Sequence, residues 1–371
     1  MRRLAILCCA ALVSTGVARA ETPLLPPFPL ADRQRAPTTV TIFKGCTAAP
    51  APVVDLLFDG FYAPGTASTV VDSAAMERYR AATQAINRFE RGLADLGDAH
   101  QADASRKVGA GNPAIAACAL DWLAGWAAGQ AMLGKVSQQG GYVRKWSLGT
   151  VATAYLRIRD AAGLSPEKKH AVENWIGVWA RTVHADYTTG TGRDSRNNNH
   201  AYWAALSVGL AAVVGNNQTL FAWAMDGYRK AAGQIGADGI LPLELARGPK
   251  ALHYHLFSLQ ALVPLAELGM RNGQDLYAEG DRALDRLIGV ALAGLAEPTL
   301  FEQRTGKKQD SVGDIGGNDL AWMEPYYTRF GLAQGKAGAA LLPWIERYRP
   351  MRNTRLGGNQ TLMYGVERLR P

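Results

Sequence analysis

Apolar side chains recur every three or four residues through most of the chain beyond residue 70, and this period predicts α-helices. Asp72 stands just before the first such segment, where the N-cap of a helix belongs. Alternation of apolar and polar residues, which marks half-buried strands, is scarce. The predicted helices cover residues 76–96, 113–134, 146–159, 166–179, 199–214, 219–234, 249–269, 275–294, 319–334 and 338–347. The chain is therefore expected to be an all-α protein.

The connections between these helices contain Gly and Asn, and no tight repeat is visible. A ring of packed helical hairpins and a generic helix bundle both satisfy the periodicity. Residues 38–371 are predicted to form one domain, preceded by a flexible, Pro-rich leader at 21–37. The segment 59–72 is rich in turn formers and is predicted to be a long surface loop, a type that often serves as a lid.

The N-terminus has the pattern of an export signal. Arg2 and Arg3 precede an apolar stretch at 4–13, and a small-x-small triplet ends at Ala20. We expect cleavage near Ala20 and a periplasmic or secreted mature protein. The apolar stretch is too short for a bilayer, which needs about 20 residues, so no stable membrane anchor is expected.

The chain carries 40 Lys and Arg residues against 32 Asp and Glu residues, a formal net charge of +8. This balance favours an anionic partner through long-range attraction, although solubility alone explains it equally well. Nucleic acid is disfavoured, because basic and acidic residues are interspersed and no nucleic-acid-binding motif is present. We expect a monomer.

Two cysteines remain after removal of the predicted signal peptide. Cys46 and Cys118 are an even pair in an oxidising compartment, which predicts one disulfide between the N-terminal segment and a helix. Two buried free thiols are the alternative.

The most unusual stretch is RDSRNNNHAYW at 193–203, in which three asparagines precede His200. Asparagine favours turns and helix caps over helix interiors. An apolar helix follows, so Asn199 and His200 are expected at its start, facing a cavity. The alternative is that one asparagine merely caps the helix.

A second stretch, LPLELARGPKALHYH at 241–255, combines Arg247 with Tyr254 on the helix that follows. Arginine is suited to holding a carboxylate through two hydrogen bonds. Each residue also has a plain alternative, an ion pair at the surface for Arg247 and packing for Tyr254. His253 and His255 diverge by about 200° on a helix, so we predict no metal site. No phosphate-binding or dinucleotide motif is present, and no cofactor is expected.

Together the two stretches closely resemble the central motifs of the alginate (poly-mannuronate) lyases, polysaccharide lyase family 5. Further runs resemble the same family: CALDWL at 118–123, VRKWSLG at 143–149, FEQRTGKKQ at 301–309, LAWMEPY at 320–326 and TRLGGNQT at 354–361. The resemblance covers about residues 44–365. It implies an incomplete α/α toroid of antiparallel helical hairpins with a deep cleft, a mobile lid and a periplasmic location.

The resemblance also implies the site residues. The family's catalytic residues correspond here to Asn199, His200, Arg247 and Tyr254. Its substrate-contacting residues correspond to Trp203, Gln139, Trp146 and Tyr62. Tyr62 would close over the sugar from the lid, whereas core packing is an equal alternative for Trp146. The cysteine pair matches a family tie between the N-terminal segment and a core helix. Some members have a lid lysine that 59–72 lacks, which leaves the polymer preference in doubt.

These residue types suit β-elimination from a uronate linked through O4. The C5 proton is barely acidic beside an ionised carboxylate, so Arg247 and Asn199, with His200 nearby, would offset charge on the carboxylate oxygens. Tyr254 is the candidate acid, and a protonated histidine beside it together with Arg247 would lower its pKa from about 10. Tyr254 in both roles and His200 as the base both remain open.

The predicted activity is therefore cleavage of a uronic-acid polymer, with mannuronate-rich alginate as the first candidate and 4-deoxy-hex-4-enuronosyl ends as products. Glucuronate-containing polymers such as glucuronan, hyaluronan or an acetan-like exopolysaccharide are the second candidate. A non-catalytic polysaccharide-binding or secretion subunit is the third.

Overall fold

The computed structural model describes residues 22–29, 42–66, 69–106, 112–190, 194–310, 312–331 and 336–365. The predicted signal peptide at 1–20, with its cleavage site, lies outside these residues. No helix in the described part combines the length and the apolar character needed to cross a bilayer. The described chain is helical apart from irregular segments and one short antiparallel pair, β1 (Arg352–Asn353) with β2 (Gly358–Asn359). The predicted all-α class is confirmed.

The helices are α1 (Ser73–Ala82), α2 (Gln84–Arg106), α3 (Pro113–Ala128), α4 (Gln138–Ile158), α5 (Pro166–Ala185), α6 (Asn199–Val214), α7 (Gln218–Ala232), α8 (Pro242–Leu245), α9 (Ala251–Arg271), α10 (Glu279–Ala296), α11 (Thr299–Thr305), α12 (Met323–Phe330), α13 (Lys336–Tyr348) and α14 (Gln360–Tyr364). Short 3-10 or π turns are η1 (Asp186–Gly190), η2 (Asp194–Arg196), η3 (Gly248–Lys250), η4 (Leu276–Ala278), η5 (Val312–Asp314) and η7 (Thr354–Leu356).

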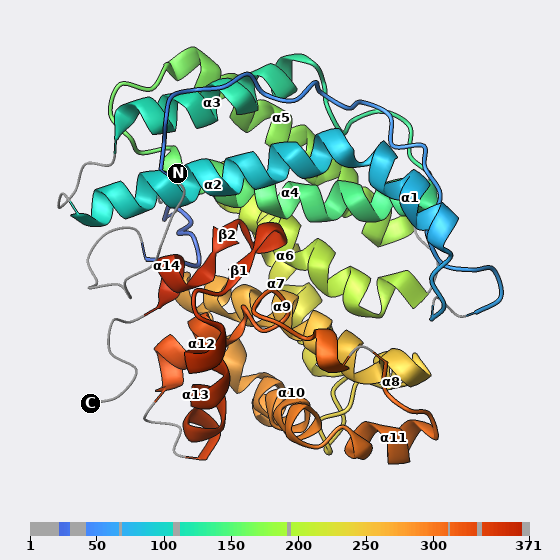
Figure 1. Ribbon diagram of the computed structural model, residues 1–371. Helices are drawn as coiled ribbons and strands as arrows, with labels where there is room; N and C mark the ends of the chain where they lie inside the picture. The colour runs from blue at the N-terminus through green and yellow to red at the C-terminus, as the bar shows by residue number, and fades with distance from the viewer. Residues whose placement is uncertain are drawn as a thin grey trace, which may run out of the picture.

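The long helices form two rows (Figure 1). An inner row contains α2, α4, α6 and α9, each packed against the next, and an outer row contains α3, α5, α7 and α10. Successive long helices alternate between the rows, so each neighbouring pair forms a helical hairpin. Residues 202–214 of the inner helix α6 are all buried, as expected of a helix that is apolar on every side.

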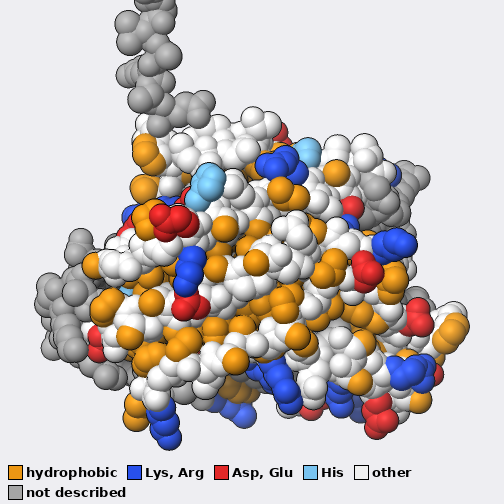
Figure 2. Space-filling model, turned by 90° about the horizontal axis from the view of Figure 1, so that it is seen from above, with side chains coloured by type: hydrophobic (Ala, Val, Ile, Leu, Met, Phe, Trp, Pro, Cys, Tyr) orange, Lys and Arg blue, Asp and Glu red, His pale blue; other side chains and the backbone are white. Residues whose placement is uncertain are grey.

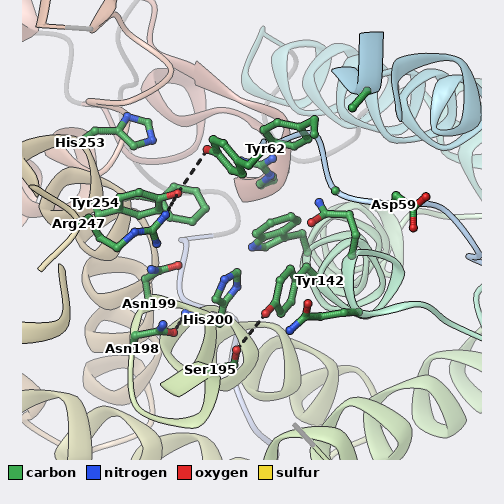
Figure 3. Close-up of a pocket in the computed structure, with 18 of the residues that line it drawn as sticks. Asp59, Tyr62, Tyr142, Ser195, Asn198, Asn199, His200, Arg247, His253 and Tyr254 are labelled. Atoms are coloured by element: carbon green, nitrogen blue, oxygen red, sulfur yellow. Dashed lines mark hydrogen bonds between the residues drawn. The ribbon is translucent and has the colours of Figure 1, made fainter. Parts of the chain in front are cut away.

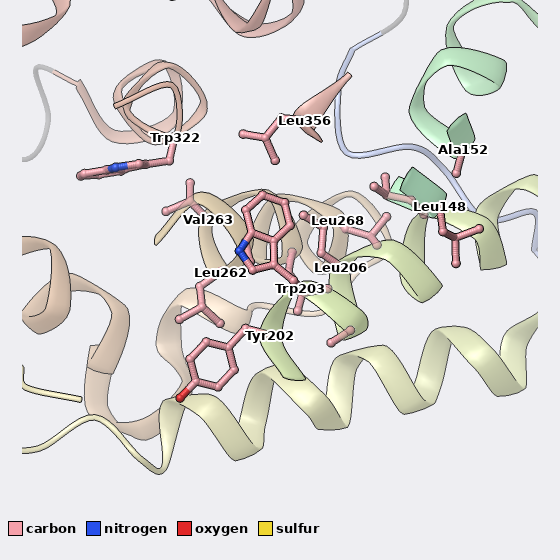
Figure 4. Close-up of a cluster of buried hydrophobic side chains, with 14 of the residues drawn as sticks. Leu148, Ala152, Tyr202, Trp203, Leu206, Leu262, Val263, Leu268, Trp322 and Leu356 are labelled. Carbon is pink, nitrogen blue, oxygen red and sulfur yellow. The ribbon is translucent and has the colours of Figure 1, made fainter. Parts of the chain in front are cut away.

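The core continues between α6 and α9. Figure 4 shows Trp203 and Leu206 of α6 packed beside Leu262 and Val263 of α9, with Trp322 close by. On the outside, the face in Figure 2 carries basic side chains with acidic ones among them, and no large patch of one sign covers its described residues.

Side-chain caps mark several helix starts, and the predicted cap at Asp72 is confirmed. Asp72 accepts a hydrogen bond from the backbone N–H of Ala75 at the start of α1, and Asn112 and Ser165 cap α3 and α5 in the same way. The segment predicted as one helix at 76–96 is instead divided into α1 and α2. Thr83 leaves the helical conformation between them, and its hydroxyl donates to the carbonyl of Tyr79.

Helix α4 begins at Gln138, eight residues before the predicted start at 146. Its first turn contains Gly140 and Gly141, which weaken the helical signal in the sequence. A Cβ atom on Gly140 would lie 1.9 Å from the carbonyl oxygen of Leu56. The glycine therefore lets the N-terminal segment lie directly on the helix, where Leu56 pairs with Val136 in an isolated bridge.

The prediction of a flexible leader is wrong for residues 22–29, which pack against the domain. Leu24 and Phe28 are 6% and 1% exposed. The backbone N–H of Leu24 donates to Asn216 Oδ1, and the ring of Phe28 meets that of Tyr364 edge to face. Burial of these two apolar side chains offsets the entropy lost on ordering the segment.

A disulfide joins Cys46 to Cys118 on α3, with the Cα atoms 5.5 Å apart. This outcome confirms the predicted bond and removes the alternative of two free thiols. The indole N–H of Trp122 donates to the carbonyl of Thr47 beside it. The chain is thus held across α3 before it reaches the loop at 59–72.

The C-terminal segment returns to the N-terminal helices. The turn from β1 through η7 to β2 packs against α2 and α4. Asp98 of α2 holds this turn in place. Its carboxylate lies 2.8 Å from Arg157 and 3.0 Å from Arg352, and it accepts a hydrogen bond from the backbone N–H of Asn359. This contact fixes Arg355, on η7, beside the starts of the inner helices.

Candidate active site

A cavity of about 1050 Å³ opens where the starts of α4, α6 and α9 meet the loop after α8. The turn-rich loop at 59–72 contributes part of its wall, with Tyr62 and Val71 paired in an isolated bridge. Its volume lies at the upper end of the range for ligand sites, so it accommodates an extended ligand. Seven of the predicted site residues line it, namely Tyr62, Gln139, Trp146, Asn199, His200, Arg247 and Tyr254.

Arg247 and Tyr254 lie side by side on one wall of this cavity (Figure 3). Arg247 Nη2 donates to the Tyr254 hydroxyl at 2.8 Å, and the guanidinium carbon lies 3.8 Å from the centre of the tyrosine ring. The Tyr62 hydroxyl, on the loop at 59–72, lies 3.4 Å from that of Tyr254, and burial raises the pKa of Tyr62.

His200 is held from two sides. Its Nδ1 lies 2.9 Å from Lys145 Nζ, and its ring stacks on Tyr142 with the centroids 3.9 Å apart. Burial lowers the pKa of His200 well below its ordinary value, and the positive charges of Lys145, Arg247 and Arg355 lower it further. The imidazole is therefore neutral, so the expectation of a protonated histidine beside Tyr254 is wrong. An amine that donates to Nδ1 leaves the ring proton on Nε2.

Asn199 lies at the first position of α6 and is fully buried, while Asn198 caps the helix. Its backbone N–H and its side-chain Nδ2 both donate to the carboxyl group of Glu244 on α8, at 2.7 Å and 3.0 Å. Burial raises the pKa of Glu244. The expectation that an asparagine at this helix start faces a cavity is confirmed, and the cap is a different asparagine.

Trp146 and Gln139 reach the cavity from α4. The Trp146 ring lies 6.0 Å from that of His200 and 4.5 Å from the guanidinium carbon of Arg355. Its indole N–H has no hydrogen-bond partner among the described residues. Gln139 forms a side-chain hydrogen bond with Tyr79. Trp146 therefore contributes an aromatic surface to the cavity, in addition to packing.

Trp203 does not line the cavity. It is 1% exposed, and its indole N–H donates to the carbonyl of Phe257. Although it shares a helix face with Asn199, it lies one turn deeper, where Phe257 covers it. The structure therefore corrects the expectation of a cleft-lining tryptophan, because this side chain belongs to the core.

His253 and His255 have separate surroundings, as their spacing predicts. His253 lines the cavity, whereas His255 is fully buried and accepts from the backbone N–H of Leu241. Burial lowers the pKa of His255 to about 4. Among the described residues, no group of three or more His, Cys, Asp or Glu side chains is placed to hold a metal ion.

Three charged residues of the site were missed in the sequence. Lys145 and Glu244 are 0% and 1% exposed, and Arg355 lines the cavity. One signal was available for Glu244, which is the charged residue in the otherwise apolar run at 240–246. Arg355 stands two residues before a Gly-Gly pair with positive φ at both positions, which marks a tight turn.

The sequence profile of the alginate lyase family matches residues 61–301. The chain belongs to this family. Alginate lyases of Pseudomonas fluorescens and Cobetia marina are both 34% identical to it, over 95% and 94% of this chain and 93% and 91% of their own lengths. A polysaccharide lyase of Stenotrophomonas maltophilia is 32% identical over 89% of this chain and 94% of its own.

Solved structures of alginate lyase A1-III have a similar fold. A variant complexed with a tetrasaccharide gives a TM-score of 0.72 at 26% identity, over 86% of this chain and 85% of that one. The structure from Sphingomonas species A1 gives 0.70 at the same identity, over 86% of each chain. The resemblance seen in the sequence is thereby confirmed, as is the α/α toroid.

Proposed function

We propose that this chain cleaves mannuronate-rich alginate by β-elimination, with Asn199, His200, Arg247 and Tyr254 as catalytic residues. Membership of the alginate lyase family supports the substrate class. The observation that carries the proposed site is the convergence of an amide, an imidazole, a guanidinium and a phenol in one cavity. The elimination breaks the C4–O4 bond after loss of the C5 proton and leaves a 4-deoxy-hex-4-enuronosyl end.

The first requirement is to offset charge on the C6 carboxylate, since removal of the C5 proton places more negative charge on its oxygens. Arg247 and the Nε2–H of His200 supply donors at this point, with Arg355 adding positive charge nearby. Such donors act most strongly in the enediolate-like transition state, and loss of one typically costs about 3 kcal/mol in the barrier.

Tyr254 is proposed as both base and acid. In this proposal the phenolate of Tyr254, at hydrogen-bond distance from Arg247, takes the C5 proton, and the resulting phenol returns a proton to the departing O4. In mannuronate the C5 proton and O4 lie on the same face, so one side chain reaches both. His200 is the poorer base, because its Nδ1 is already bonded to Lys145 and its Nε2 carries the proton. This geometry favours mannuronate over its C5 epimer.

We further propose a periplasmic location and action on an exopolysaccharide. The export pattern before residue 21 and the Cys46–Cys118 disulfide support this location, because disulfides persist in oxidising compartments. Tyr62 and Trp146 are proposed as the aromatic contacts to the sugar rings, with Gln139 beside them.

A panel of purified uronans tests the proposal. Poly-mannuronate, poly-guluronate, glucuronan and hyaluronan are each incubated with the protein, and the ultraviolet absorbance of the unsaturated uronate is followed. We expect the fastest rise with poly-mannuronate and a loss of about 100-fold or more in kcat/KM for Arg247→Ala. Arg229→Ala is the matched control, since Arg229 lies at the surface in an ion pair with Glu279. No absorbance change with any uronan would end the proposal.

A further inference from the structure

Glu244 is a buried carboxyl group directly behind the proposed site. It lies on α8 with 1% of its surface exposed. Its Oε1 accepts from the backbone N–H of Asn199 at 2.7 Å, and Asn199 Nδ2 lies 3.0 Å from both carboxyl oxygens. The backbone N–H and the side-chain NH2 group of Asn199 are therefore both hydrogen-bonded to the Glu244 carboxyl group.

This arrangement decides which atom of Asn199 faces the ligand. With Nδ2 turned toward Glu244, the amide oxygen Oδ1 is buried without a hydrogen-bond partner among the described residues. Figure 3 shows the Asn199 side chain pointing into the cavity between Arg247 and His200. An amide oxygen only accepts hydrogen bonds, so it would repel a uronate carboxylate. The amide nitrogen would instead donate a hydrogen bond to that carboxylate.

We propose that Glu244 is a positioning residue that takes up one proton when a uronate carboxylate binds, which turns the Asn199 amide over. This inference rests on the proposed function. In the bound state Oδ1 accepts from the new Glu244 hydroxyl and Nδ2 donates to the substrate carboxylate. The other Glu244 oxygen still accepts from the backbone N–H of Asn199. The proton comes from solvent and returns there after the product leaves.

The surroundings of Glu244 favour this exchange. Burial already raises the pKa of its carboxyl group, and the N–H groups of Asn199 and the positive charge of Arg247 hold it down. Tyr202 of α6 is the other titratable group that interacts with it. A bound carboxylate shares the positive charge of Arg247, and amide reversal removes the Nδ2 donor. Both changes raise the affinity of Glu244 for a proton.

The coupling has a definite sign. A ligand that raises the pKa of a group binds more tightly at low pH, because binding takes up protons. Between the free-state and bound-state pKa values of Glu244, the Kd for a mannuronate oligosaccharide should rise by about tenfold for each unit of pH. Proton uptake should approach one per site in that interval.

Isothermal titration calorimetry tests the coupling. A mannuronate oligosaccharide is titrated into the Tyr254→Phe variant, to prevent turnover, at one pH in buffers that differ in ionisation enthalpy. We expect proton uptake that disappears when Glu244→Gln is added. Equal uptake in both variants would overturn this inference and leave the proposed function intact. Absence of binding by these variants and by the wild type would overturn the proposed function and the inference with it.

Two substitutions separate positioning from simple packing. The Glu244→Gln side chain imitates the protonated carboxyl group, since it donates to Oδ1 and accepts from the backbone N–H of Asn199. It should therefore remove the rise of KM with pH. Glu244→Leu supplies neither bond and should raise KM by about tenfold or more. A KM that keeps the wild-type pH dependence in Glu244→Gln, with unchanged circular dichroism, would contradict the proposal.

Discussion

Lys145 controls the state of His200 from inside the protein. It is completely buried, and its amine lies 4.1 Å from the centre of the Trp146 ring and 4.6 Å from that of Tyr142. Burial lowers the pKa of Lys145 well below its ordinary value, and Arg355 lowers it further. A hydrogen bond donated by this amine to His200 Nδ1 would place the imidazole proton on Nε2.

Lys145→Met should reduce catalysis without reducing stability. Methionine fills a similar volume, and it removes a buried amine that is costly to charge, so the free energy of unfolding should stay equal or rise. We expect kcat to fall by about tenfold or more, because His200 loses its orienting donor. The exposed Lys168→Met is the control. A Lys145→Met enzyme with wild-type kcat would show that the contact is only structural.

The same variant should change the pH profile in one direction. Lys145 is one of the charges that lower the pKa of His200, so its removal should raise that pKa. The protonated imidazole then forms at higher pH, and the acid limb of kcat/KM should move upward. A pH–rate series on both enzymes measures this. An acid limb that stays in place or moves downward would contradict the assignment.

At this scale the sequence predicted the residues better than their partners. Asn199, His200, Arg247 and Tyr254 meet in one cavity as expected from their motifs. The protonation state of His200 could not be predicted, because it depends on a lysine 55 residues away in the chain. The family resemblance implied a ligand contact for Trp203, but a motif match gives no depth of burial, and the side chain lies in the core beside Phe257.

Between elements, the segment that leads into the loop at 59–72 lies on the start of α4. Gly140 lies under the backbone of Leu56, and Ser137 donates its hydroxyl to the carbonyl of Phe58. These contacts set the distance between the loop and the helix that carries Gln139 and Trp146. The width of the proposed site therefore depends on Gly140, which does not itself line the cavity.

Gly140→Ala and Gly141→Ala form a matched pair in one helical turn. A Cβ on Gly140 would lie 1.9 Å from a backbone oxygen, whereas one on Gly141 meets nothing within 4 Å. We expect Gly140→Ala to destabilise the fold by about 2 kcal/mol or more and to raise KM. Gly141→Ala should be neutral or stabilising by up to about 1 kcal/mol. Thermal unfolding and steady-state kinetics measure both, and equal behaviour of the two variants would refute the packing argument.

The predicted elements failed where tertiary contacts, not local periodicity, decide the boundary. The start of α4 was missed because its two glycines weaken the helical signal, and one of them, Gly140, is there for the contact with Leu56. The division at Thr83 follows from a side chain that bonds its own helix. The starts at Asn112-Pro113 and Ser165-Pro166 were predictable, since cap and proline act within a few residues.

Over the whole molecule, segments near both ends of the described chain are tied to residues far away in the sequence. Residues 22–29 reach Asn216 and Asn272, and the C-terminal turn reaches Asp98. Helical periodicity carries no information on such contacts, because they join irregular segments across about 200 residues or more of sequence. The all-α class was therefore predictable from the pattern, whereas the packing of the Pro-rich segment was not.

The Asp98 contact should be one of the most sensitive points of the fold. Asp98 and Arg157 have side chains 0% and 1% exposed, so Asp98→Asn leaves a buried guanidinium without its charged partner. We expect a loss of about 3 to 5 kcal/mol in unfolding free energy. Asp95→Asn is the control, because its ion pair with Arg352 is 41% and 38% exposed, and it should cost less than about 1 kcal/mol. Urea unfolding of both variants decides the comparison.

The disulfide makes a separate contribution, through the unfolded state and through the loop it precedes. Cys46 and Cys118 are 72 residues apart. A closed loop of that length lowers the entropy of the unfolded chain, which raises its free energy by about 4 kcal/mol at 25 °C. A Cys46→Ser, Cys118→Ser variant should therefore unfold at a lower temperature than the wild type. Addition of reductant should lower the wild-type unfolding temperature and leave that of the variant unchanged.

The bond should also affect ligand binding. Residues 47–58 run from the disulfide to the loop that carries Tyr62, and they are held to α3 and α4 by hydrogen bonds from Trp122 and Ser137. Because these hydrogen bonds remain in the variant, we expect a moderate rise in KM with little change in kcat. A large fall in kcat at unchanged KM would mean that the disulfide acts on the catalytic residues rather than on the loop.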